Sequence, residues 1–285
     1  MAASTATLSS SPAVVRRRRK GNRWPLYVAA IILTAFFVVP IYLIAVAALS
    51  PPAEISAFPK TLIPRSISFD TLLYFLSFRG VLPSIINSIV VALLTLGLST
   101  LIGTPGGYAL ARYVFRGRDP FRVLILVSRA FPISILAVPL AVTFINWSLY
   151  DTVVAVALVH TTLALPTTVL ITSSIFLAVP TDLEEAAWTL GCTPLGAFTR
   201  VVLPLALPGI AAASIFTFVL SWNEVFAATI LTVQSHTLPA QVLASLNESP
   251  LPYRFAGGFV LILPSLIFIL IIRRYLLNMW GRVVK

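Results

Sequence analysis

The chain has 285 residues, of which 58% are hydrophobic and only 10% are charged, and its formal net charge at pH 7 is +11. Soluble domains average roughly 45–50% apolar and about 25% charged residues, whereas the mean hydropathy here is +0.97. This composition excludes an ordinary soluble domain and predicts an all-α integral membrane protein.

The basic residues stand in short clusters between long uncharged stretches. A nucleic-acid-binding face requires Lys and Arg gathered along one surface, so no nucleic-acid partner is expected. Clusters of this kind match basic loops at the cytoplasmic membrane surface, which are attracted to anionic lipid and resist translocation. Membrane lipids are therefore expected partners.

Metal-ligating residues are sparse. Cys192 is the single cysteine, and the two histidines, His160 and His236, lie far apart in the sequence. An intramolecular disulfide is excluded, and the spacing offers no metal cage. We expect no metal site and no cofactor bound by this chain.

Residues 1–23 are rich in small residues and end in a basic run, which predicts a disordered cytoplasmic tail. The apolar stretch from Trp24 to Ser50 is long enough to span a membrane. A signal peptide would instead have an apolar region of about 7–15 residues and a small-residue cleavage site. We therefore predict an uncleaved first span.

Six spans are predicted in all, since a span needs roughly 20 mostly apolar residues. This count allows Arg129 and Glu224 to lie inside spans. The 51–81 connector is expected to be external, with a short interfacial helix near Phe69 to Phe78, and 278–285 to be a cytoplasmic tail. The spans cover approximately residues 24–50, 82–110, 122–147, 151–178, 204–232 and 255–277.

The distribution of basic residues orients these spans. An even number of spans places both termini and alternate loops on one side, and most Lys and Arg lie in those segments, which predicts cytoplasmic termini. The predicted cytoplasmic side holds Arg16 to Lys20, Arg23, Arg112, Arg116, Arg118, Arg122, Arg200, Arg273, Arg274, Arg282 and Lys285, against Lys60, Arg65, Arg79 and Arg254 outside.

The 180–203 segment is a polar-edged interruption between two spans. Thr181 and Glu184 have the spacing of a capping box, so a helix is expected to begin near Asp182. Gly191 is placed to end that helix in a left-handed cap. Thr193 as N-cap and Pro194 at the first position then predict a second helix, which continues to Leu203-Pro204, where the next span begins.

The first of these helices carries small residues, Ala186 and Ala187, that let another surface approach closely. The carboxylates of Glu184 and Glu185 offer charge-assisted contacts to an Arg or Lys of that surface. The pattern therefore favours a helical knob for a partner's groove. An ordinary capped connector lying on the membrane remains the alternative.

The same segment resembles a known signature. Glu185-Ala186-Ala187, three residues, Gly191, nine residues, Val201, one residue and Leu203-Pro204 are similar to the EAA motif, E-A-A-x3-G-x9-I-x-L-P, of permease subunits of bacterial ATP-binding-cassette (ABC) importers. Val201 replaces the isoleucine of the motif.

Other stretches are similar to the carbohydrate-uptake branch and its smaller maltose-type permease. The resemblance covers Trp24 to the end, although the tail lacks the family's last glycine. These stretches are Asn87-Ser88, Arg129-Ala130-Phe131-Pro132, Ser221-Trp222-Asn223-Glu224, Thr237-Leu238-Pro239 and the basic tail from Arg273 to Lys285.

The resemblance implies a six-helix, type I importer-like permease of the bacterial cytoplasmic membrane, with a coupling helix between spans four and five. Its implied partners are a second permease, two ATPase subunits that bind ATP and Mg, and an extracellular binding protein or lipoprotein. Glu185 is implied to contact the ATPase. The implied coupling residues are Glu184, Glu185, Ala186, Ala187, Leu190, Gly191, Thr193, Pro194, Leu203 and Pro204.

Catalytic motifs are missing from the sequence. Nothing fits the phosphate-binding loop G-x4-G-K-[ST], because Gly191 and Gly196 are followed by Ala197 rather than Lys. There is no His-Glu-x-x-His and no nucleophile elbow. No catalytic residue is predicted, and the resemblance implies that a separate ATPase supplies the energy.

Five residues are candidates for the solute pathway: Asn87, Arg129, Trp222, Asn223 and Glu224. Charges inside a membrane are costly and often functional. Four of them have an alternative role: helix-to-helix contact for Asn87, snorkelling for Arg129, an interfacial belt for Trp222 and solvation at the mouth for Glu224. Asn146 and His160 are weaker candidates for the same reason.

The sequence thus predicts half of an alternating-access pathway for a sugar, oligosaccharide or polyol. The alternatives are a related permease for an amino acid, polyamine or phosphate, and a membrane enzyme or scaffold. The sequence does not identify the solute.

Overall fold

A computed structural model describes residues 23–58, 62–245 and 249–281. Residues 1–22 of the predicted tail 1–23, and residues 282–285, lie outside these ranges. Within them the regular structure is helical, with no strand. The helices are α1 Trp24–Ala48, α2 Pro52–Ser56, α3 Asp70–Ser77, α4 Val81–Arg112, α5 Arg118–Ser128, α6 Ile133–Asn146, α7 Val153–Ala178, α8 Asp182–Thr189, α9 Pro194–Ala197, the π-helical turn η1 Phe198–Val202, α10 Leu203–Asn223, α11 Phe226–Leu231, α12 Leu238–Ser245 and α13 Leu251–Gly281.

Five of the described helical runs are long and apolar enough to cross a membrane, and a bent pair of helices provides a sixth candidate. The first, α1, is a uniformly apolar helix of 25 residues with Pro40 inside it. Most of its side chains are exposed, as suits a helix surrounded by lipid. Residues up to 43 form one compact unit, and residues from Ile44 onward form another.

The second unit is built around α4 and α7, which make the most extensive contact between any two of the described helices. Glycine and threonine residues line this contact, and Thr172 Oγ1 donates to the carbonyl oxygen of Gly103 at 3.0 Å. Small residues allow two helix backbones to approach closely inside a membrane. Helix α10 packs against both α4 and α7, and α13 packs against α10.

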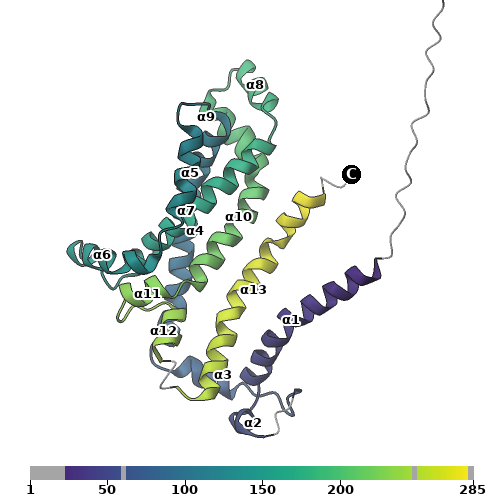
Figure 1. Ribbon diagram of the computed structural model, residues 1–285, viewed down its shortest axis with the longest axis vertical. Coiled ribbons are helices and arrows are strands. Elements are labelled where there is room, and N and C mark those ends of the chain that lie inside the picture. Colours follow the sequence, from purple (N-terminus) through teal and green to yellow (C-terminus); the bar gives the residue numbers. More distant parts are fainter. Residues whose placement is uncertain (1–22, 59–61, 246–248, 282–285) are drawn as a thin grey trace, which may run out of the picture. The chain divides into compact units, whose positions relative to one another are not determined.

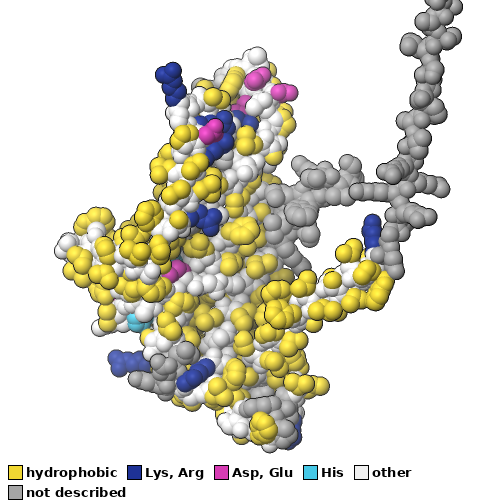
Figure 2. All heavy atoms as spheres, viewed as in Figure 1, with side chains coloured by type: hydrophobic (Ala, Val, Ile, Leu, Met, Phe, Trp, Pro, Cys, Tyr) yellow, Lys and Arg dark blue, Asp and Glu magenta, His cyan; other side chains and the backbone are white. Residues whose placement is uncertain are grey.

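The short helices occupy the two ends of this bundle (Figure 1). Helices α8 and α9 lie at one end, whereas α3, α11 and α12 lie toward the other, and α6 projects from the side, where it contacts α11. Hydrophobic side chains cover much of the visible flank, and acidic side chains gather at the α8 end (Figure 2).

The fifth and third predicted spans differ most from the structure. Residues 122–147 are divided between α5 and α6, which are bent by 87° at a break that contains Arg129. Residues 204–232 are divided between α10 and α11, and Glu224 stands at that break. Neither charge therefore lies within a continuous helix.

Other predicted boundaries shift less. The expected interfacial helix near Phe69 to Phe78 corresponds to α3, and the 51–81 connector also contains α2. Helix α13 begins at Leu251 and continues to Gly281, so its described part extends past the predicted end at residue 277.

Candidate functional site

The 180–203 segment forms two short helices joined by a tight turn. Helix α8 ends at Thr189 with Leu190 as its C-cap, and Gly191 adopts a left-handed φ of 87°. The amide of Cys192 donates to the Ala187 carbonyl at 3.0 Å, and that of Gly191 donates to Trp188 at 2.9 Å. This pair of bonds is a Schellman cap, and it explains why a glycine is needed at this position.

The second helix begins as the sequence predicts. The hydroxyl oxygen of Thr193 accepts from the amide of Gly196 at 3.1 Å, and Pro194 occupies the first helical position. Helix α10 begins at Leu203, where the sequence expects the next span, but no break separates it from the second helix. Helix α9 passes through the π turn η1 into α10, so residues 194–223 form one helical run. Pro204 is tolerated because it lies in the first turn of α10.

The predicted capping box is wrong. Thr181 has a helical conformation and its side chain makes no capping bond. Glu184 instead turns inward, where it is 3% exposed. Its carboxylate accepts from the Tyr108 hydroxyl at 2.8 Å and from Arg112 Nε, both on α4. Pairing with an arginine compensates the burial of this charge better than a partly exposed cap would.

The outer surface of this segment is apolar with an acidic edge. Glu185 and Ala186 are exposed, whereas Ala187 is 6% exposed and faces inward. Leu190 and Leu195 are 86% and 71% exposed, on either side of the Gly191 turn. Large apolar side chains this exposed at a polar helix end are typical of a contact surface.

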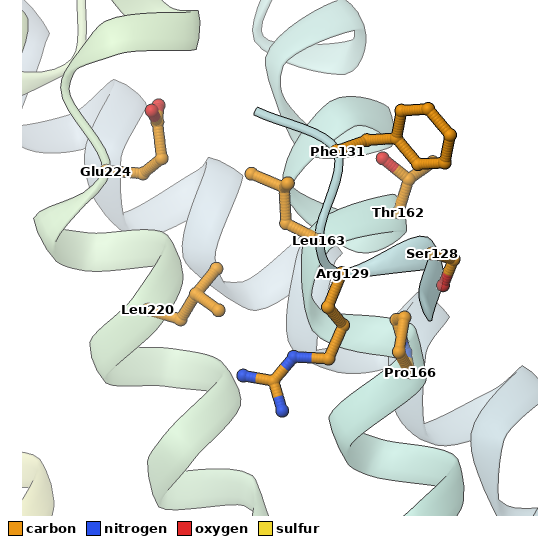
Figure 3. A pocket seen from close by; sticks show the side chains of 8 residues that line it. All are labelled: Ser128, Arg129, Phe131, Thr162, Leu163, Pro166, Leu220 and Glu224. Atoms are coloured by element: carbon orange, nitrogen blue, oxygen red, sulfur yellow. The ribbon is translucent and has the colours of Figure 1, made fainter. Parts of the chain in front are cut away.

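A pocket of about 230 Å³ lies between the end of α5, the break at residues 129–131, α7 and the C-terminal end of α10 (Figure 3). Arg129 and Glu224 both line it. Arg129 stands at the sharp bend between α5 and α6. The Arg129 guanidinium and the Glu224 carboxylate point away from each other. The lining residues are Ser128, Arg129, Phe131, Thr162, Leu163, Pro166, Leu220 and Glu224.

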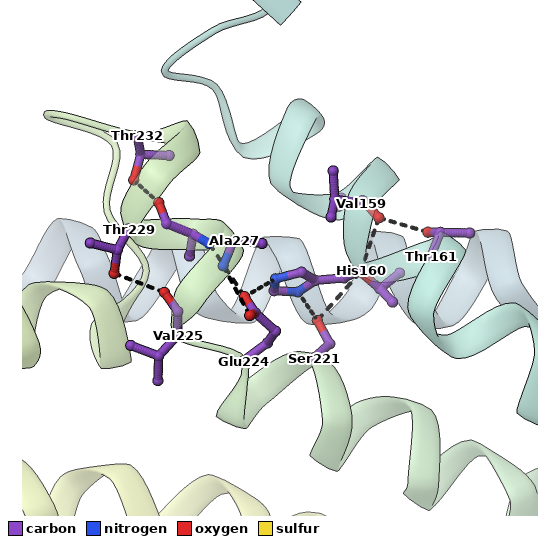
Figure 4. A network of polar contacts seen from close by, with 12 residues as sticks. Val159, His160, Thr161, Ser221, Glu224, Val225, Ala227, Thr229 and Thr232 are labelled. Atoms are coloured by element: carbon purple, nitrogen blue, oxygen red, sulfur yellow. Dashed lines mark hydrogen bonds and ion pairs between the residues drawn. The ribbon is translucent and has the colours of Figure 1, made fainter. Parts of the chain in front are cut away.

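Glu224 is held in a polar network (Figure 4). Its Oε2 lies 3.0 Å from Nε2 of His160, and its carboxylate also accepts from the amides of Ala227 and Ala228 at 2.9 and 3.3 Å. The His160 ring is fully buried, and its Nδ1 lies 2.9 Å from the Ser221 hydroxyl. Glu224 therefore caps α11 and links α10 to α7.

The other pathway candidates occupy different environments. Trp222 is 1% exposed and donates from Nε1 to the Leu261 carbonyl at 2.8 Å, so it belongs to the hydrophobic core. This burial contradicts its predicted place beside the solute. Asn223 is exposed and bonds back to Val219. Asn87 donates to the His236 carbonyl at 3.1 Å and thereby joins α4 to the segment before α12.

A second charged contact joins two loops at the opposite end from α8. Asp151 accepts from the backbone amides of Val233, Gln234 and Ser235 at 2.9–3.3 Å. Partial burial opposes ionisation of Asp151, but these amide donors outweigh it and lower its pKa. Burial likewise lowers the pKa of the nearby His236, against the opposing charge of Asp151.

Several of these relationships were not found from the sequence. Arg112 and Tyr108 are spaced four residues apart, and so share one face of a helix, but nothing marked Glu184 as their partner. Likewise, His160 and Glu224 are 64 residues apart. The one readable signal was Gly103-x3-Gly107, a small-residue spacing typical of close helix contacts in membranes.

A set of membrane-crossing helices with a pocket of apolar and charged side chains between them, and with a capped helical hairpin at one end, defines a multi-pass membrane protein of the transporter class. The chain belongs to the family described as binding-protein-dependent transport system inner membrane component, whose model matches residues 103–278. The match confirms the resemblance to importer permeases, and the EAA motif and coupling helix are typical of this family.

Curated relatives agree. The chain is 35% identical over 221 residues to the trehalose transport system permease protein SugB of Mycobacterium tuberculosis, covering 75% of this chain and 80% of SugB. It is 30% identical over 227 residues to the diacetylchitobiose uptake system permease protein DasC of Streptomyces coelicolor, covering 79% and 82%. It is 30% identical over 260 residues to the arabinooligosaccharides transport system permease protein AraQ of Halalkalibacterium halodurans, covering 88% and 92%.

Solved structures show the same fold. A chain of a bacterial ABC transporter that imports the acidic polysaccharide alginate has a TM-score of 0.70 at 22% identity, covering 90% of this chain and 98% of that chain. A chain of the MetNI methionine transporter has a TM-score of 0.57 at 18% identity, covering 72% and 98%. At these identities the likeness shows the importer-permease fold.

Proposed function

We propose that this chain forms half of the solute pathway of an ATP-driven importer for a carbohydrate, and that it works by alternating access. The observation that carries the proposal is the exposed hairpin of α8 and α9, because its shape and its EAA-type sequence suit a groove in a separate ATPase. The printed functions of three relatives, the transport of trehalose, diacetylchitobiose and arabinooligosaccharides, support the cargo class.

The complex would contain a second permease, two ATPase subunits that bind ATP and Mg, and an extracellular binding protein. In the cell membrane both termini and the hairpin would face the cytoplasm, as the distribution of Lys and Arg predicts. Glu185 is exposed on the hairpin and is the residue available to a cationic partner. Glu184 is not available, since it pairs within the chain.

The solute would meet Arg129 and Phe131 at the pocket. Arg129 is exposed and offers several N–H donors to hydroxyl groups, and the Phe131 ring is 62% exposed. Arg129 is one of the candidates that the sequence named, and Phe131 is an addition. Glu224 also lines the pocket but is bonded to His160, and Trp222 is buried away from it. Asn223 remains a candidate because it is exposed at the end of α10.

Cross-linking tests the hairpin. Cys192 is first replaced by serine, and single cysteines are then introduced at Leu190, Leu195 and Val233. In the assembled complex, Leu190→Cys and Leu195→Cys should cross-link to a nucleotide-hydrolysing subunit. Val233→Cys, exposed on a loop toward the other end of the bundle, is the control and should not. Absence of hairpin cross-links from an assembled complex would refute the proposed docking.

Proteoliposomes test the cargo. ATP hydrolysis should rise when the binding protein is loaded with trehalose, diacetylchitobiose or an arabinooligosaccharide, and should not rise with an amino acid or phosphate. Arg129→Met and Phe131→Ala should lower transport, whereas Phe121→Ala, on α5 but outside the pocket lining, should not. Stimulation by amino acids alone would favour the alternative cargo.

A further inference from the structure

Glu184 joins the hairpin to α4 rather than to a partner. It lies in the first turn of α8, and both of its carboxylate oxygens accept from α4: Oε2 from the Tyr108 hydroxyl at 2.8 Å and Oε1 from Arg112 Nε. The Glu184 side chain is 3% exposed and that of Arg112 is 10% exposed. The contact is therefore buried within this chain, while the neighbouring Glu185 faces outward.

Arg112 also contacts a third helix. Its Nη2 donates to the carbonyl oxygen of Val179 at 2.8 Å, directly after the end of α7. One guanidinium thus bonds both to the C-terminal end of α7 and to the first turn of α8, while its own backbone ends α4. The planar guanidinium presents its N–H donors in a rigid fork, which suits two acceptors held in fixed positions.

Tyr108 extends the contact to η1, the π turn that precedes α10. Its ring centroid lies 4.5 Å from that of Phe198, the first residue of η1, and 5.4 Å from that of Phe176 on α7. Phe176 is fully buried. The rings of Tyr108, Phe176 and Phe198 therefore pack together next to the Arg112–Glu184 pair. This packing limits how far the hairpin can tilt against α4.

We propose that Arg112, Glu184 and Tyr108 form an internal brace that makes α4 move with the hairpin. The chain itself connects α8 to α7 and α9 to α10, but α4 has no covalent link to the hairpin nearby. A buried ion pair resists separation, because each ion would be left without its partner. Arg112, Glu184 and Tyr108 are positioning residues. The inference rests on the proposed function, because the force that the brace would transmit comes from the separate ATPase.

Transport per ATP hydrolysed is the readout that separates a brace from a merely structural contact. In proteoliposomes that hold the assembled complex, Glu184→Gln and Arg112→Met should each lower this ratio by about tenfold, in the range expected of a mutation in a coupling network. ATPase co-purification should be retained. Asp182→Asn and Arg116→Met change exposed charges nearby and are the matched controls, with ratios like the wild type.

The double variant Arg112→Met/Glu184→Gln should be no worse than either single variant, because the two residues act through one contact. Two results would overturn the brace and place Glu184 at the ATPase surface. One is a double variant whose loss of transport per ATP hydrolysed is the sum of the two single losses, and the other is loss of ATPase co-purification in Glu184→Gln alone. Tyr108→Phe keeps the ion pair and the ring packing and should cause a smaller loss. If Tyr108→Phe and Arg112→Lys both assemble and transport with the wild-type ratio, the proposal is overturned.

Hydrogen exchange tests the contact without transport. In the purified protein, the amides of residues 184–190 should exchange at least about tenfold faster in Glu184→Gln than in the wild type or Asp182→Asn. The reason is that the Arg112–Glu184 pair holds α8 against α4. Equal exchange would overturn the brace even if the complex transports sugar. A wild-type complex without sugar-stimulated hydrolysis would instead refute the proposed function and leave this readout intact.

Discussion

Gly107 of α4 lies so close to Thr172 of α7 that a β-carbon at position 107 would stand 2.1 Å from the Thr172 hydroxyl oxygen and 2.8 Å from the amide nitrogen of Ser173. One turn earlier, a β-carbon at Gly103 would stand 2.7 Å from Thr168 Cγ2. The second of the Gly107 contacts is with backbone, which cannot rotate away. The absence of a side chain at both glycines therefore sets the distance between α4 and α7.

Gly107→Val should consequently weaken the packing of α4 on α7. Overpacking of a tight contact costs about 1–3 kcal/mol, so the midpoint of thermal unfolding in detergent should fall. Gly97→Ala on the same helix is the control, because a β-carbon there meets nothing within 4 Å. Equal midpoints for the two variants would show that α4 and α7 can separate without loss.

Removal of Glu224 should destabilise the protein through His160. In Glu224→Ala the buried His160 ring loses a partner and α11 loses its cap, and a lost charged hydrogen bond costs about 1.5–3 kcal/mol. Glu224→Gln retains an acceptor for the Ala227 amide and should cost less. The measurement is again thermal unfolding, and an equally stable Glu224→Ala variant would contradict the structural role of the network.

The Asp151 contact should make stability sensitive to acid. Its folded-state pKa is lowered by the amides of residues 233–235, so its stabilising effect is complete above the unfolded value of about 3.9. The effect is lost as pH falls through the lowered pKa. Unfolding midpoints below about pH 4 should therefore fall less steeply in Asp151→Asn, while Asp182→Asn serves as an exposed control. Parallel curves would rule out the contribution of this contact.

His236 reports on the same loop at higher pH. Burial lowers its pKa, so the neutral ring stabilises the fold above the unfolded value of about 6.5, and this contribution is lost as pH falls through the lowered pKa. Asp151 opposes that shift by its charge. In Asp151→Asn the imidazole should titrate at a still lower pH, which NMR of labelled histidine can follow.

Gly191 should tolerate asparagine better than valine. Its φ of 87° is left-handed, and asparagine adopts such values far more readily than a β-branched residue. A β-carbon at Gly191 meets nothing within 4 Å in this chain, so the cost of Gly191→Val is backbone strain of about 1–2 kcal/mol. Exchange at the Cys192 amide measures it. Equal exchange in the two variants would contradict the cap assignment.

Local signals in the sequence were sufficient for the hairpin. Gly191, Thr193 and Pro194 each suit a capping position that only a few residue types favour, and the structure places all three accordingly. The apolar runs likewise predicted α4 and α7 within a few residues. Such features depend on near neighbours, which a single sequence displays.

Long-range partners were beyond the sequence. Glu184 has the spacing of a capping residue, and only the approach of Arg112, 72 residues away, makes burial the better solution. Trp222 has the composition of a sugar contact, yet its position on α10 turns it toward α13. The pocket depended on the bend beside Arg129, where α5 ends at Ser128 and Pro132 is the N-cap of α6.

The π turn η1 sets the directions in which the side chains of α10 point around the helix axis. A π turn accommodates one more residue than an α-helical turn would, and one residue corresponds to about 100° around a helix axis. Deletion of a single residue such as Thr199 would therefore rotate α10 by roughly a quarter turn or more relative to α9. Ser221 and Glu224 would then face away from His160. A one-residue change near the hairpin would thus break the polar contacts at the far end of α10.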